Sequence, residues 1–538
     1  MENLNRRQFL NLAAGGTAAA LIPSTGCQSE FVERKNSSAG PPNIVFLMAD
    51  DHRAFAMGCA GDKNIKTPNM DKLAARGIRF QNCYATSPIC MASRATVMTG
   101  MYEYKTGCNF ATGRLSADDW NNLAYPVLLK KAGYRTAFAG KWGFPLEVSD
   151  YAGQFDKWGG FRGAGQGSYD TAANRSLKPY ARKYPHVTRA LGAFGRDFIR
   201  ESVQRQKPFC LSLSFKAPHK PHNKIDLEDQ KLYRDTNLPK PQNWGPEYSK
   251  KLPIQARLSR QYIQRSEWDA DHYDDHIKCY YQLISGVDSA VGMVLEELER
   301  RGVADNTVII YTSDNGYFCG AHGLQGKVMP YDDSSLVPLI IYDPRLHKGR
   351  KHLTCNAVAG NIDFAPTILD LARVPVPKKM DGLSLIPLIK RSSEKIHESI
   401  LLVQNWGWVN DDHSRGLAVV TERWKYIVWC YADENVPPAE ELFDLKNDPL
   451  ETGNLVAESE MRPVLEKMRK LYDLHHEHFS KHCVNDEDYT RHRQIFDRRI
   501  AWQKKQYRTY GPRPYKRNSK ALNAAYKELT GKEPPKKK

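Results

Sequence analysis

A single cysteine, Cys90, stands directly before a run of helix-forming residues in the segment SPICMASRATVMTG, residues 87–100. An arginine, Arg94, follows four residues later, and Gly100 ends the run. This pattern predicts a helix that begins at Cys90, where unpaired backbone N–H groups and the helix dipole favour negative charge. Such a place, with its own cation, suits a nucleophile, whereas a free cysteine is more commonly a buried structural residue. The spacing alone leaves both interpretations open.

Two pairs of oxygen-bearing side chains end two predicted strands that lie far apart in the chain. Asp50 and Asp51 close the apolar run PNIVFLMADD, and Asp314 and Asn315 close TVIIYTSDNG. In an open α/β sheet, ligands bind at the carboxyl ends of the strands. Three carboxylates and an amide oxygen form a hard donor set that suits calcium or magnesium rather than zinc, and facing carboxylates repel without a cation. An isolated Asp-Asp pair is usually a turn or a helix cap, but two such strand ends favour a metal site.

The elements that must position these residues alternate between strand and helix. Strands are expected at residues 42–51, 78–85, 134–142, 207–215, 307–315 and 337–344, and helices at 67–77, 125–133, about 276–301 and 364–372. This alternation predicts an α/β domain with a doubly wound, mainly parallel sheet. From about Leu383, aromatic and β-branched runs predict antiparallel strands, followed by a charged helix at about residues 459–478. We expect a smaller α+β subdomain there, and divide the chain into 1–26, 41–382, 383–500 and 501–538.

The N-terminal segment differs in composition from the rest of the chain. The stretch NRRQFLNLAAGGTAAALIPSTGC combines two arginines with a short Ala/Gly-rich apolar run. This pattern indicates a twin-arginine export signal at residues 1–26, so we expect a periplasmic, cell-surface or secreted protein. A lipid anchor on Cys27 and simple cleavage of the signal remain equally open interpretations.

The net charge of +17 is concentrated in the tail, because residues 501–538 contain nine Lys, three Arg and two Glu and so carry +10 of it. A solvated basic tail is the simplest interpretation, and binding of a polyanionic glycan or a membrane surface is a weaker one. We expect no nucleic-acid partner. The 11 cysteines show no regular spacing and no C-x-x-C pair, which argues against a disulfide scaffold and a zinc ribbon.

The segment CMASRATVMTG resembles the signature of the type I, formylglycine-dependent sulfatases of the alkaline phosphatase superfamily. Further fragments fall in the order of that family along nearly the whole mature chain: NIVFLMADD, TPNMDKLAARGIRF, GYRTAFAGKW, APHKPH, TSDNG, GAHGLQGK, VPLII, IDFAPTILDLA, DGLSLIPLI and ELFDLKNDPLETGNL. The resemblance implies an alkaline-phosphatase-like fold and an exported enzyme that hydrolyses sulfate monoesters, with a sulfated carbohydrate as the expected substrate. The segments APHKPH and GAHGLQGK are more similar to glycan sulfatases, such as iduronate-2-sulfatase, than to arylsulfatases.

The resemblance also implies a cofactor and its ligands. Cys90 would be oxidised by a formylglycine-generating or maturase enzyme to formylglycine, whose hydrate is a geminal diol that attacks sulfur. Arg94 would hold that diol and its charge near the metal. The implied ligands of a calcium ion are Asp50, Asp51, Asp314, Asn315 and the diol at residue 90.

Basic side chains and histidines are implied to contact the substrate. Lys141 and Lys327 would bind the sulfate, with Lys327 near the leaving oxygen. His219 would bind sulfate or protonate the leaving group. His222 and His322 would contact the substrate, although histidines at such places are often structural. Positioned cations suit this reaction, because hydrolysis places negative charge on the sulfuryl and leaving oxygens.

Two positions depart from the family pattern. Ala92 replaces the usual proline two residues after the nucleophile, which resembles variants that anaerobic radical maturases process. Gly143 replaces the histidine of the family segment GKWH. The histidines His219, His222 and His322 are the candidates to take over its role, and the sequence does not choose among them.

Two other functions fit parts of the sequence. A phosphomonoesterase, phosphodiesterase or phosphonate hydrolase would use the same scaffold, but a cysteine in C-x-x-S-R and a single oxygen-donor set argue against a two-zinc phosphatase. A non-catalytic surface protein that binds sulfated glycans would need only the basic face, and Gly143 keeps that alternative open.

Overall fold

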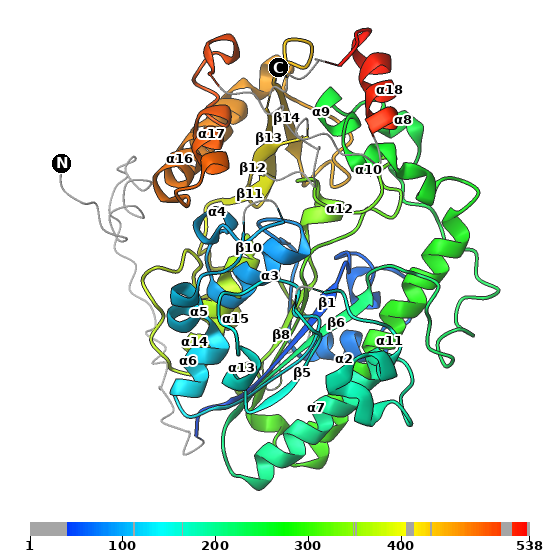
Figure 1. Ribbon diagram of the computed structural model, residues 1–538, viewed down its shortest axis with the longest axis vertical. Helices are drawn as coiled ribbons and strands as arrows, with labels where there is room; N and C mark the ends of the chain where they lie inside the picture. Colours follow the sequence, from blue (N-terminus) through cyan, green and yellow to red (C-terminus); the bar gives the residue numbers. More distant parts are fainter. Residues whose placement is uncertain are drawn as a thin grey trace, which may run out of the picture. The chain divides into compact units, whose positions relative to one another are not determined.

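An eight-stranded sheet with the order β5-β4-β6-β1-β7-β8-β2-β9 forms the centre of the computed structural model (Figure 1). Its strands are β1 (Asn43–Asp50), β2 (Ile78–Phe80), β4 (Arg135–Gly140), β5 (Lys157–Gly160), β6 (Phe209–Pro218), β7 (Thr307–Ser313), β8 (Leu339–Tyr342) and β9 (Leu353–Cys355). Among these, β8 alone runs antiparallel to its neighbours. The prediction of a mainly parallel, doubly wound sheet is therefore confirmed.

Most of the chain that follows the predicted export signal is described by the structure. The described residues are 40–110, 113–163, 165–347, 349, 352–404, 414–430, 433–506 and 519–534. The predicted signal at residues 1–26 and Cys27 lie outside them. All ten cysteines within the described residues are free thiols. In the same part of the chain, no helix has both the length and the apolar character needed to cross a membrane.

Helices cover both faces of the central sheet (Figure 1). In β1, Ile44, Phe46 and Met48 face one layer and Val45 and Leu47 face the other, because side chains alternate along a strand. The first layer contains α3 (Cys90–Thr99), α5 (Ala117–Leu123), α6 (Tyr125–Lys131), α14 (Phe364–Leu371) and α15 (Ile386–Lys390). The second layer contains α2 (Pro68–Arg76), α7 (Val187–Gln204) and α11 (Tyr273–Arg300). Burial on both faces explains why the strand sequences are continuously apolar.

Short elements connect these layers. They are α4 (Glu103–Thr106), α8 (Pro246–Ser249), α9 (Ile254–Arg257), α10 (Arg260–Ile263), α12 (Asp332–Ser335) and α13 (Pro344–His347). The single strand expected at residues 78–85 is instead two strands, β2 and β3 (Cys83–Tyr84). The reason is that β3 leaves the central sheet and pairs in parallel with β10 (Ala359–Gly360).

A second, four-stranded antiparallel sheet follows, as the sequence predicts. It consists of β11 (Ile400–Gln404), β12 (Gly416–Val420), β13 (Trp424–Trp429) and β14 (Ala439–Asp444), in that order. Helix α16 (Arg462–His482), followed by α17 (Glu487–Ile495), packs on one face. The other face packs on Phe318, Leu324, Met329 and Tyr331. The small sheet therefore supports the segment that carries Lys327.

The predicted division of the chain into domains stays a prediction. Helix α15 lies after the boundary expected near Leu383, yet it packs against the central sheet. The basic tail, expected to be solvated, contains α18 (Ser519–Thr530). Its apolar residues recur at i, i+3, i+4 and i+7, namely Leu522, Ala525, Tyr526 and Leu529. This stripe packs against Leu258, so the helical part of the tail is attached to the rest of the protein.

Glu441 on β14 links the small sheet to the segment that carries Lys327. Its Oε2 accepts hydrogen bonds from the Tyr331 hydroxyl at 2.8 Å and the Trp429 Nε1–H at 2.6 Å. Burial raises the pKa of Glu441 from 4.5 to about 7. The folded protein therefore retains a proton that the unfolded chain releases, and stability is lost as the pH rises from the unfolded pKa through the folded one.

We expect the free energy of unfolding to fall by about 2–3 kcal/mol between about pH 5 and about pH 8 through Glu441 alone. Glu441→Gln should remove this contribution, because an amide does not titrate. Urea denaturation of the two proteins across this pH range measures the difference. Parallel pH profiles for wild type and variant would contradict the assignment.

Candidate active site

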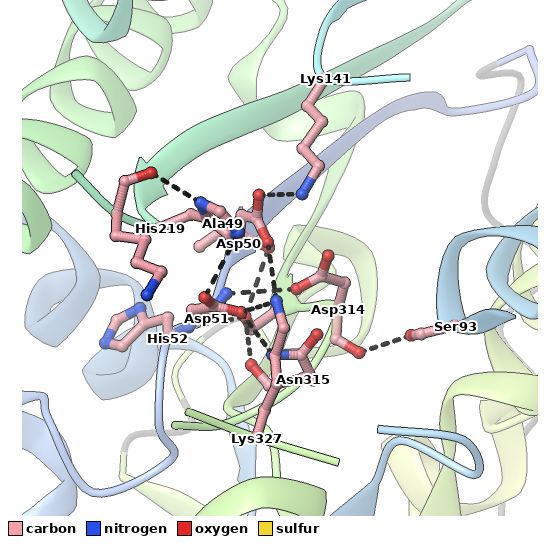
Figure 2. Close-up of polar contacts among 12 residues, drawn as sticks. Ala49, Asp50, Asp51, His52, Ser93, Lys141, His219, Asp314, Asn315 and Lys327 are labelled. Atoms are coloured by element: carbon pink, nitrogen blue, oxygen red, sulfur yellow. Dashed lines mark hydrogen bonds and ion pairs between the residues drawn. The ribbon is translucent and has the colours of Figure 1, made fainter. Parts of the chain in front are cut away.

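Six of the predicted site residues converge at the carboxyl edge of the central sheet (Figure 2). They end or follow four strands: Asp50 and Asp51 at the end of β1, Lys141 after β4, His219 after β6, and Asp314 and Asn315 after β7. Because β6, β1 and β7 are parallel neighbours, their ends bring these side chains together. The backbone of Asp51 has φ of 70°, a conformation that is uncommon for a residue with a side chain and recurs at functional sites.

Two lysines neutralise the buried carboxylates from different sides (Figure 2). The Lys141 ammonium donates to Asp50 Oδ2, and the Lys327 ammonium donates to Asp51 Oδ1 and lies 3.8 Å from Asp50 Oδ1. Asp314 Oδ1 accepts the backbone N–H of Asp51 at 3.2 Å. Burial opposes ionisation of Asp50, yet the nearby cations, Lys141 first, hold its pKa well below the ordinary value. Burial raises the pKa of Asp314 to about 6.

Two buried oxygen atoms of this group have no hydrogen-bond partner among the residues that the structure describes. They are Asp50 Oδ1 and Asn315 Oδ1, whereas the Asn315 amide N–H donates to Asp51 Oδ1 at 2.7 Å. One ligand atom each from Asp50, Asp51 and His219 lies within 4.8 Å of the others. Buried oxygens are normally paired, so these two unpaired atoms suit a hard cation such as calcium. The residues present therefore fit the predicted ion.

Cys90 begins helix α3, as the sequence predicts. The helix ends at Gly100, which has φ of 65° and donates its N–H to the Thr96 carbonyl at 2.8 Å. The Cys90 thiol is buried against Val328, and electrostatic interactions connect it to both Arg94 and Lys327. The structure therefore places this thiol at a helix N-terminus, beside the cations of the acidic group.

Arg94 is held rigidly by groups from three elements. Its Nε donates to Asp314 Oδ2 at 2.8 Å, and its Nη2 lies 2.8 Å from the same oxygen. Its Nη1 donates to the Lys141 carbonyl at 2.8 Å and to the Ser214 hydroxyl. Gly143 has φ of 88°, and a Cβ at that position would lie 2.6 Å from Arg94 Cδ. A histidine at position 143 therefore does not fit while Arg94 holds this conformation.

His219 presents one ring nitrogen to the carboxylates. Its Nε2 lies 3.9 Å from Asp51 Oδ2, and its Nδ1 lies 2.8 Å from the Lys220 carbonyl. Since a carbonyl only accepts, Nδ1 carries the hydrogen and Nε2 presents a lone pair. Burial lowers the pKa of His219 to about 4, so the imidazole is neutral near pH 7.

The other two predicted histidines are packed among aromatic rings. His222 lies edge-on to Trp268 and Tyr317, and burial lowers its pKa to about 3. His322 stacks on Tyr331 with 4.9 Å between ring centroids, and burial lowers its pKa to about 4. Both residues are buried, and their Nε2 atoms have no hydrogen-bond partner among the described residues. Their contact with substrate stays a prediction.

Two supports of the site lie in the expected segments 90–94 and 216–222, but sequence reasoning gave neither residue a role. Ser93 donates its hydroxyl to the Asp314 carbonyl and accepts from Asn361 Nδ2 at 2.9 Å, which ties α3 to the end of β7 (Figure 2). Lys216 is buried on β6, three residues before His219, and burial lowers its pKa to about 8. A lysine inside the otherwise apolar strand FCLSLSFKAP was the signal that could have found it.

Comparison with known proteins assigns the chain to a protein family. The family model described as Sulfatase matches residues 42–374, and the one described as N-sulphoglucosamine sulphohydrolase, C-terminal matches residues 320–477. An N-acetylglucosamine-6-O-sulfatase of Bacteroides thetaiotaomicron is 29% identical over 508 residues, which cover 83% of this chain and 88% of that protein. An arylsulfatase of Clostridium perfringens is 28% identical over 477 residues, which cover 80% and 93%.

Solved structures share the alkaline-phosphatase-like fold. A structure in complex with its substrate D-glucosamine-2-N,6-O-disulfate matches with a TM-score of 0.69 and 26% identity, and covers 84% of this chain and 100% of that chain. A phosphonate monoester hydrolase of Agrobacterium radiobacter matches with a TM-score of 0.66 and 18% identity over 81% and 96% of the two chains, which shows the fold alone. Because the Sulfatase model spans more than half of the chain, this protein belongs to the sulfatase family and is a sulfuric ester hydrolase.

Proposed function

We propose that this enzyme hydrolyses sulfate monoesters on a sulfated carbohydrate, with a formylglycine made from Cys90 and a bound calcium ion. The observation that carries the proposal is the convergence of the Cys90 thiol with three carboxylates and their cations at one sheet edge. The relatives named for sulfated glucosamines support the substrate class. The export signal predicted at residues 1–26 favours a substrate outside the cytoplasm.

The proposed cofactors have defined places among the described residues. Asp50, Asp51, Asp314 and Asn315 would hold calcium, with the free Asp50 and Asn315 oxygens as direct ligands. When bound, calcium supplies a fixed positive charge next to residue 90. When present, a hydrated formylglycine supplies two hydroxyls on one carbon, one to attack sulfur and one whose deprotonation releases sulfate.

The side chains of the site provide the remaining catalysis. Lys141 and Lys327 would bind the sulfuryl oxygens, and Lys327 would stabilise or protonate the leaving oxygen. Arg94 is fixed by Asp314 and needs no reorganisation to hold negative charge beside residue 90. His219 would hold or release a proton at Nε2, the ring nitrogen that faces the site. These groups stabilise charge that grows as the ester bond breaks.

Two measurements test the proposal: the mass of the peptide that contains Cys90, and the rates of hydrolysis of different esters. Mass spectrometry of the peptide containing Cys90, from protein matured in its native host, should show a loss of about 18 Da, since the thiol sulfur and two hydrogens leave and one oxygen enters. Side-by-side rates should favour sulfate esters over phosphate and phosphonate esters. An unmodified thiol would overturn the formylglycine proposal. Faster phosphonate turnover would establish the alternative hydrolase, and no turnover of any ester would favour a binding protein.

Gly143→Ala is expected to lower sulfate ester turnover at least about tenfold, because a Cβ displaces Arg94 from its contacts. The matched control is Gly133→Ala. Gly133 also has a left-handed backbone, with φ of 91°, but a Cβ there meets no atom within 4 Å. Both variants should lose about 1 kcal/mol of stability through backbone strain, Gly143→Ala should lose more because Arg94 also leaves its contacts, and only Gly143→Ala should lose activity. Equal activity of the two variants would contradict this role of Gly143.

A further inference from the structure

Lys216 differs from the other buried lysines of the described chain in lacking a carboxylate partner. Lys141 is paired with Asp50, and Lys425 is paired with Asp332 and Glu451. In the part of the chain that the structure describes, the Lys216 ammonium makes no ion pair or hydrogen bond. The ammonium instead makes a cation–π contact with Tyr169, whose ring centroid lies 5.2 Å from Nζ.

This arrangement is costly unless an anion binds. The Lys216 residue is only 3% exposed, so its ammonium has lost most of its contact with bulk water, and no carboxylate among the described residues pairs with it in return. A cation–π contact of this length recovers only a part of that loss. The missing partner is therefore expected to be a ligand rather than another side chain.

The electrostatic surroundings locate that ligand. The charged groups that act on Lys216 are Asp50, Lys141, Asp51 and Lys327, which are all members of the site described above. Tyr169, the residue under the ammonium, donates its hydroxyl to the His219 carbonyl and so belongs to the same edge. Lys216 also precedes His219 by one tight turn, because the His219 N–H donates to the Lys216 carbonyl at 2.9 Å.

The side chains of the site carry more positive than negative charge, which favours the binding of an anion. Four cationic side chains meet three carboxylates there: Arg94, Lys141, Lys216 and Lys327 against Asp50, Asp51 and Asp314. The carboxylates already engage the other three cations, so Lys216 is the cation that no acid compensates. A tetrahedral oxyanion at the centre of the site would complete its coordination.

We propose that Lys216 binds the sulfuryl group of the substrate, with its ammonium on a non-bridging oxygen, and holds inorganic sulfate in the same way after hydrolysis. This inference rests on the proposed sulfate ester chemistry and adds a residue to it. Lys216 is then a third sulfate-binding lysine. It lies on β6, whereas Lys141 follows β4 and Lys327 lies on the segment that the small sheet supports.

Lys216→Met tests the proposal, because methionine has a similar length and no charge, and Lys216→Arg keeps the charge. The control is Lys207→Met, which changes an exposed lysine just before the opposite end of β6. The binding of inorganic sulfate, measured by calorimetry in calcium-loaded protein, should weaken about 10- to 100-fold in Lys216→Met. Lys216→Arg should lose less, and Lys207→Met should match wild type.

Thermal unfolding separates binding from a structural role. Without sulfate, Lys216→Met should unfold at the wild-type temperature or above, because an unpaired buried charge is gone. Sulfate should raise the unfolding temperature of wild type and Lys207→Met, but much less that of Lys216→Met. If Lys216→Met does not fold, Lys216→Gln is measured in the same way. Unchanged sulfate affinity in a folded variant would overturn the proposal.

Rates of sulfate ester hydrolysis distinguish a failure of this proposal from a failure of the proposed function. If wild type hydrolyses sulfate esters and Lys216→Met has the same kcat/KM, the role of Lys216 is wrong and the function stands. If wild type hydrolyses no sulfate ester, the proposed function fails, and the sulfate-binding measurement still decides whether Lys216 is an oxyanion ligand.

Discussion

Cys90→Ala is expected to abolish sulfate ester hydrolysis, with a fall in kcat of at least about 10⁴-fold. Under the proposed function, alanine has no sulfur to oxidise, so no formylglycine forms at the start of α3. The loss should exceed that of any substitution around the site, because the other residues only stabilise charge that this nucleophile generates. Release of inorganic sulfate from a sulfated sugar measures the effect.

The control for this prediction is Cys279→Ala on α11. Cys279 is also a free thiol, but it is half-buried on a helix of the layer opposite α3. This variant should keep wild-type kcat. Thermal unfolding of the calcium-free protein should be unchanged in Cys90→Ala, which separates lost chemistry from lost structure. Turnover by Cys90→Ala at more than a trace of the wild-type rate would show that another group is the nucleophile.

Asp50→Asn is expected to have the next largest effect. The change removes one charge and keeps the shape, so the free oxygen that faces the site becomes a much weaker ligand. Removing a group that only supports a metal ligand lowers metal affinity roughly 10- to 100-fold. Removing the charge of a ligand itself should therefore lower calcium affinity by more than roughly 100-fold. Turnover should fall in parallel. Calcium titration followed by thermal unfolding measures the affinity.

Asp305→Asn is the matched control, because Asp305 is an exposed carboxylate just before the amino end of β7, whereas Asp314 follows its carboxyl end. It should bind calcium as wild type does. Saturating calcium should restore part of the activity of Asp50→Asn if the charge acts through the ion. If Asp50→Asn bound calcium normally but lost turnover, Asp50 would act on Lys141 instead of on a metal.

The short-range features of the site follow from the sequence. The helix that starts at Cys90 and stops at Gly100 is determined locally, because a glycine readily adopts the left-handed C-cap. The strand ends at Asp50 and Asp314 are marked by an abrupt change from apolar to acidic residues. Parallel strands then bring these ends to one edge, so the acidic group could be predicted from the residue pattern alone.

Other features depend on contacts between distant segments, which no local pattern encodes. The sequence showed Gly143 only as a departure from a family pattern, and the structure explains it, because Arg94 occupies the space that a side chain would fill. His222 and His322 stay predicted substrate contacts, and only the tertiary structure shows that both pack among aromatic rings. The sequence shows Lys216 as a lysine in a mostly apolar strand, and the tertiary structure shows that no carboxylate among the described residues pairs with it.

The sequence by itself determined the acidic strand ends and the order of the elements and predicted the nucleophile, since these depend on residue types and on spacing within single elements. The tertiary structure decided which groups are paired and which are left free, because pairing in a buried site depends on distances between side chains that lie up to hundreds of residues apart. Among the described residues, the unpaired oxygens of Asp50 and Asn315 and the Lys216 ammonium without a carboxylate partner are products of that second level. They are the groups on which the proposed cation and anion sites rest.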